Sequence, residues 1–292
     1  HQMNATPSLL DALQVQPSTF FLGETKVDRE GMNDMLRHLG VLDQFSTDAP
    51  SGSEEMIEVA GRLCYMSFDT KLNLNLTRTR TGNAPYVQNI LSSGHGSVLE
   101  HGFINFGIMD CSPILTHELV RHRAGTGFSQ QSGRYVAIDR ENSGFFFPGA
   151  FREAVESGKM TEDELRQLEA EANEYLEGVF AFQDRLVSLT HIREEGYDFA
   201  LKKKLTSAFR RFAAAGLRTR IIFSANHRAL RHIIALRNDI HAEEEVRIVA
   251  FQIGGMMKSR FPNVYSDMEL VEITNSATGR VEQVWKFANN KV

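Results

Sequence analysis

The stretch that decides the fold is RHRAGTGFSQQSGRY, at residues 121–135. Within fifteen residues it contains three arginines, one histidine, three serine or threonine hydroxyls and three glycines. Arginines suit the bidentate recognition of phosphate, and glycines with small hydroxyls let a backbone approach an anion closely. A polar surface loop with incidental arginines is the alternative interpretation. The stretch therefore suggests an anion-binding loop, and the rest of the chain must decide between the two.

The charge of the chain is distributed unevenly. Its 292 residues include 32 Lys and Arg and 37 Asp and Glu, which gives a formal net charge of −5. Between Leu201 and Arg237 there are ten Lys or Arg and no Asp or Glu, so the remaining 255 residues carry −15. A cationic segment in an acidic chain suggests a small anionic ligand, because nucleic-acid-binding proteins are more often basic overall. A solvated basic surface is the alternative for this segment.

The composition is that of an ordinary globular protein. Hydrophobic residues make up 42% and charged residues 24% of the chain. This balance excludes intrinsic disorder, collagen-like repeats and a disulfide-stapled mini-protein. No apolar run approaches the roughly 20 residues that cross a bilayer, so we expect no membrane partner. Cys64 and Cys111 form no CxxC motif, which predicts a reducing, cytoplasmic environment.

The spacing of hydrophobic residues predicts a single α+β domain in which a sheet packs with long helices. One helix is expected after Ser53, and another after Thr161, where Thr161 and Glu164 form a capping box. A further long helix is expected from Asn226 to near Arg260. The β elements expected are a strand over residues 103–108, a short apolar run over 219–223, and a hairpin that pairs 270–274 with 281–287.

Several catalytic motifs are excluded by their spacing. The segment HELVRH at residues 117–122 resembles a zinc-binding HExxH motif with one residue too many. Its histidines, at i and i+5, lie about 140° apart on a helix, so they do not share one face. The chain also lacks a GxGxxG motif, a phosphate-binding-loop lysine and a GxSxG elbow. We therefore expect no metal site and no dinucleotide site of the Rossmann type.

The remaining motifs resemble, in order, those of the flavin-dependent thymidylate synthases. RHR at residues 121–123, followed by a spacer and SGRY at 132–135, is similar to the signature of that family. GHGSVLEH at 94–101 resembles its flavin-contacting segment. NHRALRH at 226–232, together with Arg237, resembles its flavin and nucleotide helix.

The resemblance covers roughly residues 54–262 and implies a catalytic domain over this range. Residues 1–53 are then an N-terminal leader, which we expect to be irregular, and residues 263–292 form a C-terminal hairpin or tail. Members of the family are homotetramers whose active sites combine residues from several subunits. The resemblance implies FAD-dependent reductive methylation of dUMP at C5 to dTMP, with methylene-tetrahydrofolate as carbon donor and NADPH as reductant. No nucleic-acid partner is expected.

The resemblance also implies which residues contact each ligand. Flavin contacts are implied at His95, Ser97, Glu100, Arg121, His122, Arg123, Asn226, Arg228 and His232. Nucleotide contacts are implied at Glu118, Gln130, Ser132, Gly133, Arg134, Arg210 and Arg237.

Three of these residues have implied catalytic roles. Arg237 would face the pyrimidine, where its guanidinium can stabilise negative charge that develops during attack. Ser132 would bind phosphate rather than act as a nucleophile, since no assigned base activates it. Arg121 would lie between both ligands. Neither cysteine occupies a nucleophile motif, so a reduced flavin is expected to supply the hydride chemistry.

Two departures from the family pattern leave the substrate open. The spacer after Arg123 holds eight residues, Ala124 to Gln131, where the family has seven, and Ala213-Ala214 replaces a Leu-Pro pair. The longer spacer keeps open a related flavin-dependent C5 methylase or hydroxymethylase that acts on UMP or dCMP. A more remote alternative is a nucleic-acid-binding module that uses residues 201–237.

Overall fold

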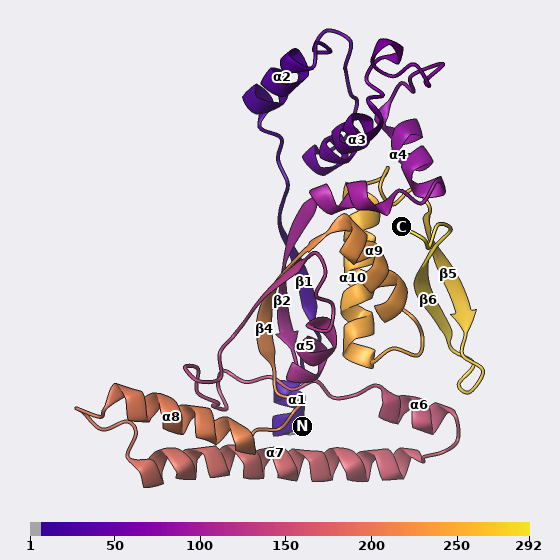
Figure 1. The fold of residues 1–292 in the computed structure, drawn as a ribbon. Helices are drawn as coiled ribbons and strands as arrows, with labels where there is room; N and C mark the ends of the chain where they lie inside the picture. Colours follow the sequence, from indigo (N-terminus) through magenta and orange to yellow (C-terminus); the bar gives the residue numbers. More distant parts are fainter. Residues whose placement is uncertain (1–6) are drawn as a thin grey trace, which may run out of the picture.

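The computed structural model describes residues 7–292 and has a four-stranded antiparallel sheet at its centre (Figure 1). The strand order is β1-β2-β4-β3. The strands are β1 (Ser18–Glu24), β2 (Phe103–Cys111), β3 (Thr126–Gln130) and β4 (Thr219–Asn226). In the register of the sheet, Phe223 of β4 lies opposite both Phe106 of β2 and Phe128 of β3. The architecture is α+β, as predicted, and β2 confirms the strand expected at 103–108.

Helices and a separate hairpin surround this sheet. The α-helices are α1 (Leu9–Leu13), α2 (Arg29–His38), α3 (Gly52–Tyr65), α4 (Asn83–Ser92), α5 (Pro113–Leu119), α6 (Ala150–Glu156), α7 (Glu162–Thr190), α8 (Phe199–Phe209), α9 (His227–Arg237) and α10 (Glu244–Arg260). The 3₁₀ helices are η1 (Thr70–Leu72), η2 (Gly96–His101) and η3 (Arg210–Phe212). The paired strands β5 (Met268–Thr274) and β6 (Val281–Phe287) confirm the predicted hairpin. No helix within residues 7–292 has both the length and the apolar composition that crossing a bilayer needs.

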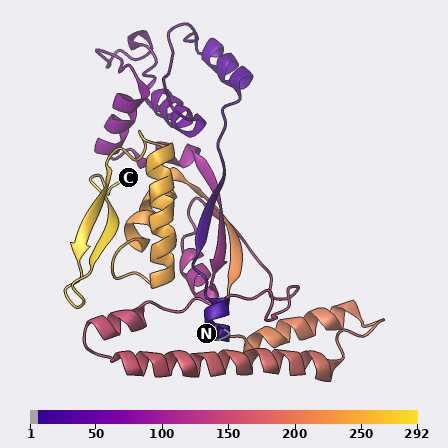
Figure 2. The ribbon, with the colours of Figure 1, turned by 180° about the vertical axis from the view of Figure 1, so that it is seen from behind.

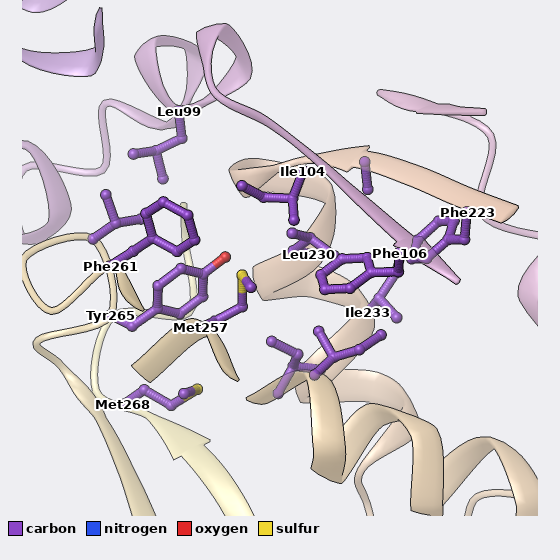
Figure 3. Packing of buried hydrophobic residues seen from close by; sticks show 14 of the residues in the cluster. Leu99, Ile104, Phe106, Phe223, Leu230, Ile233, Met257, Phe261, Tyr265 and Met268 are labelled. Carbon is purple, nitrogen blue, oxygen red and sulfur yellow. The ribbon is translucent and has the colours of Figure 1, made fainter. Parts of the chain in front are cut away.

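One face of the sheet is covered by α9 and α10 (Figures 1 and 2). Side chains alternate along a strand, so β4 directs Phe223 and Ala225, both fully buried, to this face. Figure 3 shows Phe106 and Phe223 beside Leu230 and Ile233 of α9. Burial of such apolar surface stabilises the fold by about 25 cal/mol per Å². This packing fixes how α9 is rotated against the sheet.

The opposite face of the sheet presents apolar side chains to solvent. Phe20 and Leu22 of β1, Phe103 of β2 and Ile222 of β4 are between 40% and 55% exposed in the single chain. These residues occupy the alternate strand positions to the buried ones. Large exposed apolar side chains that cluster on one face are typical of a protein–protein contact.

An arm formed by α7 and α8 extends across one end of the sheet (Figures 1 and 2). The 29 residues of α7 span about 44 Å at 1.5 Å per residue. The predicted capping box is confirmed: Thr161 Oγ1 accepts a hydrogen bond from the backbone N–H of Glu164 (3.2 Å), and the Glu164 carboxylate accepts one from the N–H of Thr161 (2.8 Å). Leu13 of α1 and Leu176 of α7 share a second hydrophobic cluster.

The prediction of an irregular leader over residues 1–53 is wrong for the part that the structure describes; residues 1–6 lie outside it. β1 pairs with β2 from Ser18 opposite Met109 to Glu24 opposite Ile104, so it is an edge strand of the central sheet. The reason is that Phe20, Phe21 and Leu22 form a short continuous apolar run, which lacks the apolar/polar alternation that identifies a half-buried strand. The domain boundaries at residues 54 and 262 stay a prediction.

Two predicted helices differ in their bounds. The helix expected from Asn226 to Arg260 is two helices, α9 and α10, separated by a turn. Asp239 accepts a hydrogen bond from the N–H of His241 (3.0 Å), a local bond that competes with helical pairing. The helix expected after Ser53 begins two residues earlier than Glu54, at Gly52, with Ser51 as its N-cap.

A buried ion pair ties α9 to the hairpin that follows it. Arg231 donates to both carboxylate oxygens of Asp267, at 2.7 and 2.9 Å, and the two side chains are only 2% and 9% exposed. Arg231 also donates to the carbonyls of Val264 (2.9 Å) and Asn289 (3.0 Å). The guanidinium therefore holds the chain before and after the hairpin in place.

We predict that Arg231→Met lowers the free energy of unfolding by about 3–5 kcal/mol, because Asp267 is left as a buried charge without its partner. Urea unfolding at pH 7 and a fixed protein concentration measures the loss. The control is Arg37→Met, which removes an exposed pair with Asp34 and should cost less than about 1 kcal/mol. Equal losses in the two variants would contradict a special stabilising role for the buried pair of Arg231 and Asp267.

Candidate active site

A cavity of about 560 Å³ opens at the start of α9; we refer to it as the α9 cavity. Seven of the nine residues expected to contact a flavin line it: Glu100, Arg121, His122, Arg123, Asn226, Arg228 and His232. These side chains come from η2, from the stretch after α5 and from the first turns of α9. The fold thus brings together three segments that are distant in the sequence.

The α9 cavity has the charge of an anion site. Its wall carries the guanidiniums of Arg121, Arg123 and Arg228 and one carboxylate, Glu100, which accepts from Arg228 Nη1 at 2.5 Å. The wall also includes the N-terminus of α9, whose helix dipole favours negative charge. Asn226 caps this helix by accepting from the N–H of Ala229 at 2.9 Å.

A glycine is required where the loop passes the cap of α9. Gly125 has φ +68°, and a Cβ there would overlap the Asn226 side-chain amide. Its carbonyl accepts a hydrogen bond from the backbone N–H of Asn226 at 2.9 Å. The glycine after RHR therefore lets the loop and the helix start form one wall.

The other two expected flavin contacts, His95 and Ser97, do not line the α9 cavity. His95 stacks on Tyr65, with ring centroids 5.3 Å apart, and lines a smaller cleft of about 180 Å³. Ser97 is exposed. Between them, Gly96 sits so close to Arg228 that a Cβ would lie 3.0 Å from its Nε. A flavin role for His95 and Ser97 stays a prediction.

Arg237 lies farther along α9, beside the α9 cavity. It follows Ala229 and Ile233 of the cavity wall at intervals of four residues, so it shares their face of the helix. Its Nε donates to Nε2 of His122 at 2.9 Å. Its Nη1 donates to the Glu118 carboxylate at 2.5 Å, and its Nη2 to the Glu118 carbonyl at 3.2 Å. The guanidinium is thereby held in one orientation.

His122 is kept neutral by its surroundings. Burial lowers its pKa to about 4, with further lowering by the positive charge of Arg237 and by His232, while Glu118 acts in the opposite direction. Because arginine stays protonated, Nε2 of His122 must be the acceptor, which leaves the ring proton on Nδ1. The imidazole therefore serves as an oriented hydrogen-bond acceptor near pH 7.

A second cavity of about 880 Å³ lies around the loop of residues 131–143; we refer to it as the loop cavity. Four of the expected nucleotide contacts line it, namely Gln130, Ser132, Gly133 and Arg210. Gly133 approaches Arg210 so closely that a Cβ would lie 3.1 Å from its Cδ. The backbone N–H of Arg134 donates to Ser132 Oγ at 3.3 Å.

The loop cavity contains basic side chains that the motifs did not identify. His117, Arg218 and Arg220 also line it, and Arg220 donates to the side-chain carbonyl of Gln131 at 2.9 Å. Both arginines belong to the cationic segment of residues 201–237. Arg218 comes directly before β4, and Arg220 is the second residue of β4. That spacing is the signal that could have found them.

Within one chain, the two cavities do not bring all the expected nucleotide contacts together. Among the described residues, Arg134, Arg237 and Glu118 line neither cavity. Arg237 and Glu118 lie beside the α9 cavity. β3 separates the cavities, since Gly125 lines one and Gln130 the other. Five residues of strand at about 3.3 Å each place Gly125 and Gln130 about 17 Å apart, whereas His117 of the loop cavity and Arg121 of the α9 cavity are only four residues apart in the chain.

Comparisons with known proteins agree with the motifs. A family model described as "Thymidylate synthase complementing protein" matches residues 47–263. A relative named flavin-dependent thymidylate synthase, from Mycolicibacterium vanbaalenii, is 35% identical over 232 residues, which cover 79% of this chain and 85% of the relative. Proteins of the same name from Mycolicibacterium gilvum and Mycobacterium tuberculosis are 35% and 34% identical and cover 80% and 79% of this chain, and 86% and 85% of their own length.

We predict that NMR titration of His122 gives a midpoint near pH 4, and that Arg237→Ala raises it, because a neighbouring positive charge is removed while the burial remains. The folded pKa lies below the unfolded value of about 6.5. The unfolded state therefore binds more protons between these values, and stability falls as the pH drops from 6.5 towards 4. Arg37→Ala, far from the ring, is the control. A midpoint near 6.5 in the unchanged protein would contradict this environment.

Proposed function

Because the chain belongs to the flavin-dependent thymidylate synthase family, we propose that it catalyses the FAD-dependent reductive methylation of dUMP at C5 to dTMP. Methylene-tetrahydrofolate is the proposed carbon donor and NADPH the proposed reductant. The observation that carries the proposal is the α9 cavity, where seven expected flavin contacts meet beside the oriented guanidinium of Arg237.

The α9 cavity fits the anionic part of FAD. Arg121, Arg123 and Arg228 provide three fixed positive charges, and the start of α9 adds its dipole. We assign to these arginines the pyrophosphate of the cofactor. When bound, a reduced flavin supplies the hydride chemistry that amino-acid side chains lack.

Arg237 is the proposed electrostatic catalyst. A guanidinium has five N–H groups, and His122 and Glu118 accept from three of them. The remaining two are available to a pyrimidine carbonyl. Since arginine stays charged, Arg237 can stabilise the negative charge that develops on the pyrimidine as C5 attacks. His122 and Glu118 act by fixing its orientation.

The loop cavity is the proposed site for the nucleotide phosphate. Arg210 provides a cation, and Ser132 and Gly133 lie beside it. The hydrogen bond recorded for Ser132 Oγ among the described residues is one that it accepts from a backbone N–H, so no base is seen to draw its proton. This supports phosphate binding by Ser132 over a nucleophilic role.

The separation of the cavities supports active sites shared between subunits. Within one chain, the nucleotide contacts that the family implies are divided: some line the loop cavity, Arg237 and Glu118 lie beside the α9 cavity, and Arg134 lines neither. We infer a homotetramer in which the α9 cavity of one subunit meets the loop cavity of another. The exposed apolar side chains on the open face of the sheet, such as Phe20 and Leu22, and on the arm, such as Leu189 and Phe199, are suited to such contacts.

A second candidate is methylation or hydroxymethylation of UMP or dCMP at C5. The observation in its favour is that Ala124 and Gly125, the first two residues of the longer spacer, line the α9 cavity. A nucleic-acid-binding module has less support, because arginines of the basic segment pair with carboxylates: Arg218 with Asp110, Arg228 with Glu100, Arg231 with Asp267 and Arg237 with Glu118. Such pairing leaves a less basic surface for a polynucleotide.

The test is to incubate the purified protein with FAD, NADPH, methylene-tetrahydrofolate and each of dUMP, UMP and dCMP. We expect a flavin absorbance spectrum and dTMP as the product. Turnover of UMP or dCMP but not of dUMP would establish the second candidate. A colourless protein with salt-sensitive polynucleotide binding would contradict both.

In the same assay, Arg237→Ala is expected to lower the rate by about 100-fold or more, since it removes the charge that stabilises the transition state. FAD should stay bound, because the three arginines of the α9 cavity are unchanged. Arg37→Ala is the matched control and should keep full activity. Loss of flavin together with activity would contradict the role of Arg237 as a catalyst that does not bind the cofactor.

A further inference from the structure

The wall of the α9 cavity includes a segment that none of the motifs identifies. Asn290, Lys291 and Val292 line the cavity together with the expected flavin contacts. They belong to residues 288–292, which follow β6 and lie beyond the 47–263 range of the family match. Figure 1 shows this end of the chain beside α9. We refer to it as the 288–292 segment.

The 288–292 segment is held by the buried ion pair of α9. The backbone N–H and the side-chain amide of Asn289 donate to Asp267 at 3.0 and 3.1 Å, and its carbonyl accepts from Arg231 at 3.0 Å. The N–H of Ala288 donates to the Asp267 carbonyl at 3.0 Å. Arg231 lies on α9 between Arg228 and His232, so the helix that forms the cavity also positions this segment.

The other side of the segment contacts the turn before η2. A Cβ on Gly96 would lie 3.3 Å from Cα of Val292, and a Cβ on Gly94 would lie 3.9 Å from Cβ of Lys291. The segment therefore runs between this turn and the start of α9. Val292 packs against the main hydrophobic cluster. The backbone of the 288–292 segment is therefore in contact with the protein on two sides.

Lys291 carries a charge that no carboxylate side chain of the described residues neutralises. Its side chain is exposed, and across residues 7–292 its ammonium forms no ion pair with a carboxylate. Glu100, the carboxylate of the cavity wall, is paired with Arg228 instead. A lysine on a flexible stem at the mouth of a cationic cavity is suited to a phosphate oxygen.

We propose that the 288–292 segment is a wall of the cofactor site, and that Lys291 binds the phosphate groups of the flavin dinucleotide alongside Arg121, Arg123 and Arg228. This inference rests on the proposed function, because it takes the α9 cavity as the flavin site. Lys291 stands at the mouth of the cavity, where its charge opposes the departure of the bound phosphate groups. Its contribution should therefore appear in the rate at which bound FAD leaves.

The test measures FAD dissociation from the full-length holoenzyme, by the recovery of flavin fluorescence after dilution. Lys291→Ala is expected to raise the dissociation rate about fivefold, the effect of an exposed charge pair. Lys291→Glu should raise it further, and Lys291→Arg should stay close to the unchanged protein. The differences should shrink as salt is added. Lys159→Ala, an exposed lysine after α6, is the matched control and should have no effect.

Unchanged dissociation rates in both Lys291→Ala and Lys291→Glu would overturn the inference and leave the proposed function standing. Slower dissociation would overturn it as well, because the segment would then compete with the cofactor. An unchanged protein that binds no FAD would overturn the proposed function and this inference together. Thermal unfolding of each variant checks that the fold is intact, which is expected since Lys291 is exposed.

Discussion

The packing of α9 against the sheet is the constraint on which the rest of the structure depends. Leu230 and Ile233 are buried against β2 and β4, which fixes the rotation of the helix (Figure 3). This rotation also sets where the arginines of α9 point. Arg228 reaches the cavity at its start, Arg231 the buried carboxylate of the hairpin, and Arg237 the loop after α5. One helix therefore positions the α9 cavity, the hairpin and the guanidinium of Arg237.

The sheet adds a second constraint, which is distance. The α9 cavity lies at one end of β3 and the loop cavity at the other, and the strand between them is about 17 Å long. The cationic segment of residues 201–237 supplies arginines to both cavities, Arg210 to one and Arg228 to the other. In the proposed assembly, one chain presents two halves of a site, and a second copy of the chain brings the complementary half.

The ordered motifs predicted the family and most of the α9 cavity, because RHR and NHRALRH each act through local spacing that the fold preserves. The capping box at Thr161 and the hairpin were predicted for the same reason. The break between α9 and α10 was missed because a local hydrogen bond, from the N–H of His241 to Asp239, forms the turn there. The spacing of hydrophobic residues carries no information on such a bond. The edge strand β1 and the segment containing Lys291 were missed because tertiary pairing alone defines them.

The most direct test of the central claim, a site shared between subunits, is complementation between two inactive variants. Arg237→Ala damages the α9 half and Arg210→Glu the nucleotide half. Equal amounts are mixed under conditions that allow subunit exchange, and dTMP formation is measured. If each site is built from two subunits, random mixing gives an intact Arg237 in half of the sites and an intact Arg210 in half. About one quarter of the sites then have both residues, so about one quarter of the unchanged activity returns. A mixture that stays as inactive as either variant alone would contradict the account.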